Sequence, residues 1–161
     1  MLWKKNNKKD FFICHASEDK KEYALPICKA LIKEGCWLDI YEIIPGDNII
    51  EKIQDGIKNS RYALILLTEN WLKKDWARLE FASLLSRQIR TKSKIVIPVM
   101  IADKDLILNE IPLLESINYI QCTTLDDVVA RLKELIESDK PQCVSYGYNL
   151  LSSGEIILKA D

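Results

Sequence analysis

The chain alternates short apolar runs with longer stretches in which apolar residues recur at helical spacing. The apolar runs have the length and continuity of buried strands, and they occupy residues 11–14, 36–41, 62–67, 94–100 and 118–122. The amphipathic stretches, each with one apolar face, occupy residues 17–35, 48–59, 76–90 and 124–138. Residues 103–116 are mixed in character and indicate short helical turns. Strands that alternate with helices in this way predict parallel strands joined by right-handed crossovers.

This pattern predicts an α/β fold: a flavodoxin-like five-stranded parallel sheet with helices on both faces and the strand order 2-1-3-4-5. Ligands of such sheets bind outside the carboxyl ends of the strands. Three segments that follow predicted strands are therefore expected at that edge. They are residues 15–19, which we call the first loop, residues 44–47, which we call the Pro-Gly loop, and the start of the helix at Trp76.

The ends of the predicted helices carry recognisable signals. Ser17 follows the first strand and precedes two acidic residues, so it is expected to cap the first helix. Pro26 lies inside that helix and predicts either a kink or a later start. Gly35 is expected to end the helix, and Asp75 is expected to cap the helix over residues 76–90.

The same pattern divides the chain into three parts. Residues 1–9 contain four lysines and are interpreted as a basic, solvated leader. Residues 10–140 form the α/β domain. Residues 141–161 break the rhythm, and two apolar segments around Ser-Ser-Gly are typical of a β-hairpin. This C-terminal extension is expected to cover a sheet edge, to begin a further domain, or to be loosely ordered.

Composition narrows the classes of protein. The chain has 161 residues, of which 48% are hydrophobic and 29% charged, as in a single folded domain. Its net charge of −1 gives no field to hold nucleic acid or an anionic membrane, so neither is expected as a partner. No apolar run is long enough to cross a bilayer, and no signal peptide is recognised. Five cysteines without a CxxC pair, with one histidine, indicate reduced thiols in the cytoplasm and no metal site.

One short stretch carries candidate chemistry. In "KKDWARLEF", Trp76 and Glu80 are four positions apart, so a helix would place them one turn apart on one face. Tryptophan is usually buried and glutamate is usually exposed, so this pair on one helix face is a candidate functional site. The alternative is a half-buried tryptophan beside a solvated glutamate.

Three motifs, in order, resemble a known family. "DFFICHASED", "GCWLDIYEIIPGD" and "SRYALILLTENWLKKDWARLE" look like the first box, the second box and the Trp-x-x-x-Glu region of a TIR (Toll/interleukin-1 receptor) domain of bacterial type. The resemblance runs from about residue 10 to residue 138. Cys14 and Thr68 stand where serine is usual, and Ala16 stands where some catalytic members carry a longer polar residue.

The resemblance implies an enzyme, an NAD⁺ nucleosidase that cleaves the nicotinamide–ribose bond and needs no cofactor besides NAD⁺ as substrate. It implies that Glu80 is the catalytic carboxylate. The product, ADP-ribose or a cyclic ADP-ribose isomer, stays open. Substrate-binding residues expected from their place in the motifs are Trp76, His15, Ala16, Asp39, Pro45, Gly46 and Asp47. The alternatives are a loop histidine at 15, a loop-organising carboxylate at 39 and a plain turn at 45–47.

The expected partners follow from the same resemblance. TIR domains self-associate through the region of the Pro-Gly loop, and isoleucines at 43, 44, 49 and 50 flank this turn. The expectation is a bacterial immune or signalling effector that is activated by assembly and works with an upstream or downstream defence protein. The alternative function is a non-catalytic TIR scaffold that acts only through TIR–TIR interactions.

Overall fold

A computed structural model describes residues 9–44, 46–91, 95–138, 147–150 and 156–159. Inside these ranges the side chains of Ile43, Ile49, Asp75, Trp76, Ala77 and Glu80, and those of the last two strands, lie outside the described part. Residues 1–8 of the predicted leader and most of the predicted extension also lie outside it.

The central sheet has five parallel strands in the order β2-β1-β3-β4-β5, which confirms the predicted fold class and strand order. The strands are β1 (Lys9–Ala16), β2 (Leu38–Ile43), β3 (Ser60–Leu67), β4 (Val96–Met100) and β5 (Ile120–Gln121). The register is continuous along β1, where Phe11 lies opposite Leu38 on one side and Tyr62 on the other.

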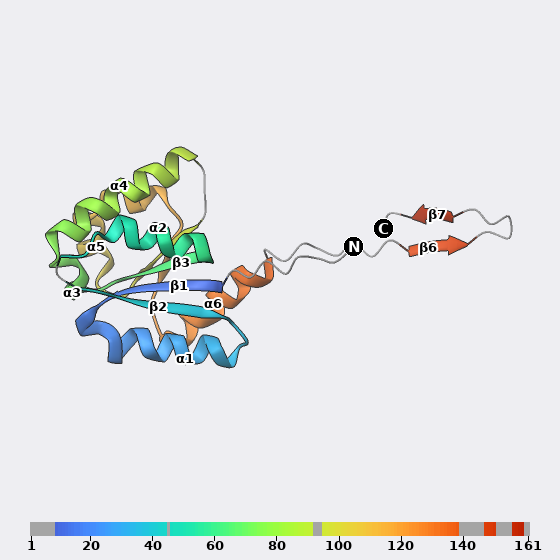
Figure 1. The fold of residues 1–161 in the computed structure, drawn as a ribbon, viewed down its shortest axis with the longest axis horizontal. Helices are drawn as coiled ribbons and strands as arrows, with labels where there is room; N and C mark the ends of the chain where they lie inside the picture. The colour runs from blue at the N-terminus through green and yellow to red at the C-terminus, as the bar shows by residue number, and fades with distance from the viewer. Residues whose placement is uncertain (1–8, 45, 92–94, 139–146, 151–155, 160–161) are drawn as a thin grey trace.

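Helices cover both faces of the sheet (Figure 1). They are α1 (Leu25–Lys33), α2 (Ile49–Asn59), α3 (Glu69–Leu72), α4 (Asp75–Thr91), α5 (Lys104–Glu110) and α6 (Leu125–Ser138). A 3₁₀ turn over Pro112–Ser116 follows α5, as the mixed composition of residues 103–116 predicts. Among the described residues, no helix is both long and apolar enough to span a membrane.

Two apolar cores result, because alternate residues of a strand point to opposite faces. Phe12 and Cys14 of β1 pack in the core under α2, α4 and α5, whereas Phe11 and Ile13 pack in the core under α1 and α6. Both faces of β1 and β3 are therefore buried, which explains their continuous apolar sequence. Gly56 of α2 lies so close to Phe12 that an added Cβ would stand 2.5 Å from the ring.

The structure corrects the start of the first helix. Ser17 does not cap a helix; its hydroxyl donates to Glu18 instead, at 3.0 Å. A 3₁₀ turn (Ser17–Asp19) and a π turn (Lys20–Ala24) precede α1, which begins at Leu25 with Pro26 in its first turn. The later start is the favourable one, because the missing N–H of proline costs nothing in the first turn of a helix.

The end of α1 fixes the start of β2. Gly35 has φ of +81° and its N–H bonds to Ile32 O, while Cys36 N–H bonds to Leu31 O at 3.0 Å. These two bonds form a Schellman motif, which satisfies the last carbonyl groups of the helix. The motif occupies Cys36, so the second strand begins at Leu38 and not at residue 36 as predicted.

The last two described strands, β6 (Gly147–Leu150) and β7 (Ile156–Lys159), pair antiparallel in a sheet of their own. Gly147 lies opposite Lys159, and Leu150 lies opposite Ile156. The division between residues 10–140 and this extension stays a prediction.

Candidate active site

The predicted site segments follow the carboxyl ends of three neighbouring strands. β1 runs into the first loop, β2 into the Pro-Gly loop, and β3 into α3 and then α4 (Figure 1). Because these strands are parallel and adjacent, the three segments begin at one edge of the sheet, which is where α/β proteins bind ligands.

Trp76 and Glu80 lie in the first two turns of α4, which begins at Asp75 and runs to Thr91. Their helical backbone places them one turn apart on one face, as the sequence predicts. Arg78 N–H bonds to Lys74 O at 3.2 Å, so Lys74 precedes the first turn and Asp75 lies within it. Asp75 is therefore the first residue of α4 and does not occupy the N-cap position predicted for it. The catalytic role of Glu80 and the stacking role of Trp76 stay predictions, because these side chains lie outside the described part.

His15 is fully buried at the end of β1. Its Nδ1 donates to the carbonyl oxygen of Ala16 at 2.6 Å, and its Nε2 has no partner among the described residues. Ala16 is buried too, in the core under α2 and α4. Neither side chain reaches the surface in this conformation, so a contact with a nucleotide would require the first loop to move.

The two carboxylates of β2 lie at opposite ends of the strand. Asp39 is near the amino end and pairs with Lys9, so the structure does not bring it to the carboxyl edge with the other candidates. Glu42 lies opposite His15 near the carboxyl end and pairs with Lys20 at 3.2 Å. Of these two, only Glu42 is in place to organise the loops at the candidate site.

The Pro-Gly loop is closed by its own residues. Asp47 accepts hydrogen bonds from the Tyr41 hydroxyl and from Ile44 N–H at 3.0 Å, and its own N–H bonds to Ile44 O. Gly46 has φ of +93°, a conformation that glycine adopts without strain. The pKa of Asp47 is lowered mainly by the hydrogen bond from the Tyr41 hydroxyl, and further by the bond from Ile44 N–H. Pro45 lies outside the described residues.

Three residues that the sequence did not single out as site candidates form a polar cluster at this edge, in which Asp19 and Thr68 are buried and Asn70 is partly buried. Asp19 is 2% exposed and accepts hydrogen bonds from the Thr68 hydroxyl and from Asn70 Nδ2, the latter at 2.7 Å. A buried carboxylate is uncommon unless it is paired or fully hydrogen-bonded. The sequence held one signal for this cluster: Asp19 and Thr68 are polar residues that follow adjacent apolar strands.

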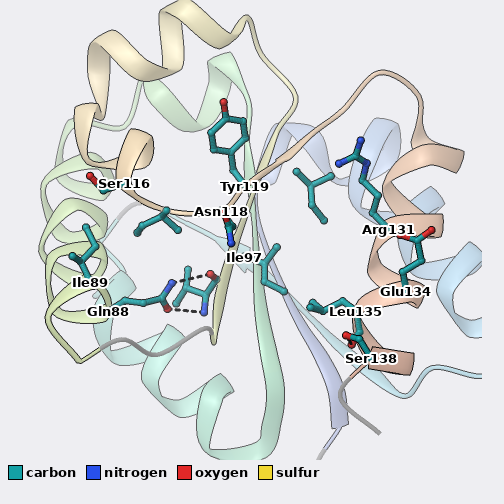
Figure 2. Close-up of a pocket in the computed structure, with 13 residues that line it drawn as sticks. Gln88, Ile89, Ile97, Ser116, Asn118, Tyr119, Arg131, Glu134, Leu135 and Ser138 are labelled. Carbon is teal, nitrogen blue, oxygen red and sulfur yellow. Dashed lines mark hydrogen bonds between the residues drawn. The ribbon is translucent and has the colours of Figure 1, made fainter. Parts of the chain in front are cut away.

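A sizeable cavity lined by described residues lies elsewhere (Figure 2). It measures about 730 Å³ and lies between α4 and α6, beside the amino ends of β4 and β5. Gln88 in its wall bonds through its amide to both backbone groups of Val96, at 2.8 and 3.0 Å. Gln88 is twelve positions beyond Trp76, about 18 Å along a helix. This cavity is therefore distinct from the candidate site at the carboxyl edge.

Among the described residues, no group of three or more His, Cys, Asp or Glu side chains lies close enough to hold a metal ion. Cys14 is buried, and burial raises the pKa of its thiol, which keeps it protonated and unreactive.

Comparison with known proteins identifies relatives of the chain. The family model for the TIR domain matches residues 11–136. The 2′ cyclic ADP-D-ribose synthase BtTIR of Bacteroides thetaiotaomicron is 32% identical over 131 residues, which cover 78% of this chain and 45% of that protein. The NAD(+) hydrolase TcpC of Escherichia coli O6:H1 is 33% identical over 96 residues, which cover 58% and 31%. The chain thus spans less than half the length of these curated relatives.

Solved structures agree on the fold. The TIR domain of the Toll-related receptor TRR-2 from Hydra magnipapillata has a TM-score of 0.53 and 19% identity, with 81% of this chain and 98% of that chain covered. The heterodimer of the RPS4 and RRS1 TIR domains gives a TM-score of 0.56 and 18% identity, with 80% and 97% covered.

Proposed function

The chain belongs to the TIR-domain family, and on that premise we propose that it cleaves NAD⁺ between nicotinamide and ribose, with Glu80 as the essential carboxylate. The observation that carries the proposal is the position of Trp76 and Glu80, one turn apart at the start of α4 and at the carboxyl edge of the sheet. Relatives named as NAD(+) hydrolase and 2′ cyclic ADP-D-ribose synthase, 32 and 33% identical, support it.

One carboxylate is enough for this reaction. Glycosidases ordinarily need a second carboxyl group to protonate the leaving group. Nicotinamide departs from a cationic nitrogen as a neutral molecule, so it needs no acid. The ribose becomes oxocarbenium-like, and a fixed negative charge stabilises it more in the transition state than in the substrate. Glu80 supplies that charge, and Trp76 offers a ring face to a base or to the nicotinamide.

The product is ADP-ribose when water reaches the ribose carbon first, and a cyclic ADP-ribose isomer when a group of the substrate itself does so. One relative is named as an NAD(+) hydrolase and another as a 2′ cyclic ADP-D-ribose synthase. The proposed biological role is that of a bacterial immune or signalling effector, with assembly through the Pro-Gly loop as the activating event.

The test is the substitution Glu80→Gln, which keeps the size of the side chain and removes its charge. We expect kcat to fall by about a hundredfold or more while KM and the circular dichroism spectrum stay unchanged, because the charge acts in the transition state. Glu137→Gln on the exposed surface of α6 is the matched control and should keep full activity. Products are identified by chromatography after incubation with NAD⁺. Unchanged turnover in Glu80→Gln would falsify the assignment.

A second candidate, the non-catalytic scaffold, is favoured by one observation. Ile44 of the Pro-Gly loop is 52% exposed, and an exposed apolar residue on a loop favours contact with another protein. A wild-type protein that self-associates but leaves NAD⁺ intact at every concentration would support the scaffold and exclude the enzyme.

A further inference from the structure

The first loop is fastened to the segment that leads into α4. The carboxylate of Asp19 is almost fully buried and accepts hydrogen bonds from Thr68 and Asn70, which flank the start of α3. Thr68 also accepts a bond from Trp71 N–H at 3.1 Å, so one hydroxyl caps α3 and donates to Asp19 at the same time. The amino end of α3 therefore has its position set by Asp19.

A second tie from the same loop reaches the other end of α3. Lys74 Nζ lies 3.4 Å from Glu18 Oε1; the Lys74 side chain is 14% exposed and the Glu18 side chain is 52% exposed. The pKa of Glu18 is lowered mainly by a hydrogen bond from its own backbone N–H, and further by Ser17 and Lys74, so the carboxylate stays charged. Lys74 directly precedes Asp75, the first residue of α4. Neighbouring residues of the first loop thus hold both ends of the short helix.

The core carries this constraint to the candidate site. Trp71 of α3 is fully buried and packs edge to face on Phe81 of α4, with ring centroids 5.1 Å apart. Phe81 is also fully buried and is the residue next to Glu80. Since α3 is fixed by Asp19 and Phe81 is fixed by α3, the first turns of α4 cannot rotate or slide without breaking this contact.

We propose that Asp19 is a positioning residue: through Thr68, Asn70 and α3 it sets the register of the first turns of α4 against the first loop, and so the place of Glu80. We call the hydrogen bonds of Asp19 to Thr68 and Asn70, together with the contact of Trp71 on Phe81, the clamp. The expected effect of the clamp on activity rests on the proposed function, whereas its effect on the position of α4 does not. Catalysis is sensitive to such placement, because a displacement of about 1 Å at a reacting group costs on the order of a hundredfold in rate.

The experiment compares Asp19→Ala with Leu132→Ala. Leu132 is a fully buried residue of α6 in the other core, so its truncation destabilises the protein without touching the clamp. We expect Asp19→Ala to lower kcat by ten- to a hundredfold with KM changed less than threefold. Leu132→Ala should leave kcat per folded molecule unchanged. Equal losses in both variants, or unchanged kcat in Asp19→Ala, would overturn the inference.

A readout without activity separates this inference from the proposed function. Hydrogen exchange should become at least tenfold faster at the backbone amides of residues 69–80 in Asp19→Ala, relative to Leu132→Ala at equal stability. If the wild-type protein does not cleave NAD⁺, the proposed function fails and the exchange alone decides on the clamp. Exchange over residues 69–80 that matches the control overturns the clamp whatever the activity.

An exchange of partners gives a rescue test that retains the size of each side chain. Asp19→Asn keeps an oxygen for the Thr68 hydroxyl but turns an amide toward the amide of Asn70. The added substitution Asn70→Asp gives that amide an acceptor. We expect the double variant to regain at least half of the kcat and exchange protection lost in Asp19→Asn. A double variant with no higher kcat or exchange protection than Asp19→Asn contradicts the clamp. This test remains decisive if Asp19→Ala fails to fold.

Discussion

The first loop and the Pro-Gly loop follow neighbouring strands at one edge of the sheet, yet their hydrogen bonds lead in different directions. Asp19 of the first loop accepts hydrogen bonds from Thr68 and Asn70, which follow the neighbouring strand β3. Asp47 of the Pro-Gly loop bonds to Tyr41 and Ile44, within six residues of itself. The first loop is thereby part of the frame of the domain, whereas the Pro-Gly loop is a self-contained turn.

Burial follows the same division. The Asp19 carboxylate is buried, so the loss of either donor leaves one carboxylate oxygen without a hydrogen bond. The Pro-Gly loop carries Ile44, which is half exposed. A loop that must hold a catalytic helix in place benefits from rigid cross-links, and a loop that must meet another molecule benefits from independence. On the proposals made above, the first loop positions Glu80 and the Pro-Gly loop contacts a partner.

The largest expected loss of stability tests the cross-link of the first loop. Thr68→Val removes the donor to the buried Asp19 and the cap of α3 together, so we expect the free energy of unfolding to fall by roughly 2–4 kcal/mol. Urea denaturation measures it. The matched control is Thr124→Val, because Thr124 caps α6 by accepting from Asp127 N–H at 3.1 Å and is exposed. Equal losses in both variants would mean that the bond to Asp19 adds nothing beyond a cap.

The strand order and the two cores were predictable from the sequence, because alternating apolar runs and amphipathic stretches leave few topologies. Helix α3 was not predicted, since the four residues Glu69–Leu72 are too few to show a helical period. The prediction that Ser17 caps the first helix was also wrong. That serine has the residue type of a cap, but the chain there forms 3₁₀ and π turns before the proline.

The candidate site was predictable only in part. Its expected location followed from the sheet topology, and the placement of Trp76 and Glu80 on one helix face followed from their spacing. Their roles in catalysis and binding came from the family resemblance and stay predictions. The buried pair of Asp19 and Thr68 was not, because the two residues are 49 positions apart and aspartate is usually exposed. His15 was expected in a loop, but β1 continues through Ala16 and buries the imidazole.

A smaller loss is expected when the Pro-Gly loop is opened. Tyr41→Phe removes the donor to Asp47 and keeps the ring that stacks on Phe12, with centroids 5.9 Å apart. Water replaces the lost bond at the partly exposed carboxylate, so we expect a loss of about 0.5–1 kcal/mol in urea denaturation. Tyr119→Phe is the control, because the Tyr119 hydroxyl makes no hydrogen bond to a described residue. A loss as large as that of Thr68→Val would erase the distinction between the loops.

A still smaller effect is expected with pH. The Tyr41 hydroxyl, then Ile44 N–H, lower the pKa of Asp47, so the folded state prefers the carboxylate. This contribution to stability is present above the pKa of an unfolded aspartate, about 3.9, and is lost as the pH falls through the lower folded pKa. A carbon NMR titration of the Asp47 carboxyl group in the wild type and in Tyr41→Phe measures it. We expect the pKa to rise in the variant, and identical values would show that Tyr41 does not hold the loop.

The smallest effect on stability, and the sharpest test of the independence of the Pro-Gly loop, is expected for Ile44→Asp. Ile44 is 52% exposed and its backbone N–H already bonds to Asp47, so the free energy of unfolding should change by less than about 0.5 kcal/mol. If the loop meets a second copy, a charge there should abolish any rise of mass in light scattering, and of specific activity, over a hundredfold range of concentration. Ile32→Asp is the control, because Ile32 is 57% exposed near the end of α1, far along the chain from both loops. A wild-type protein that stays monomeric with constant specific activity over this range would remove the need for a contacting loop. Loss of self-association in Ile32→Asp but not in Ile44→Asp would place the contact on α1 and leave the Pro-Gly loop as a turn that serves only its own strand.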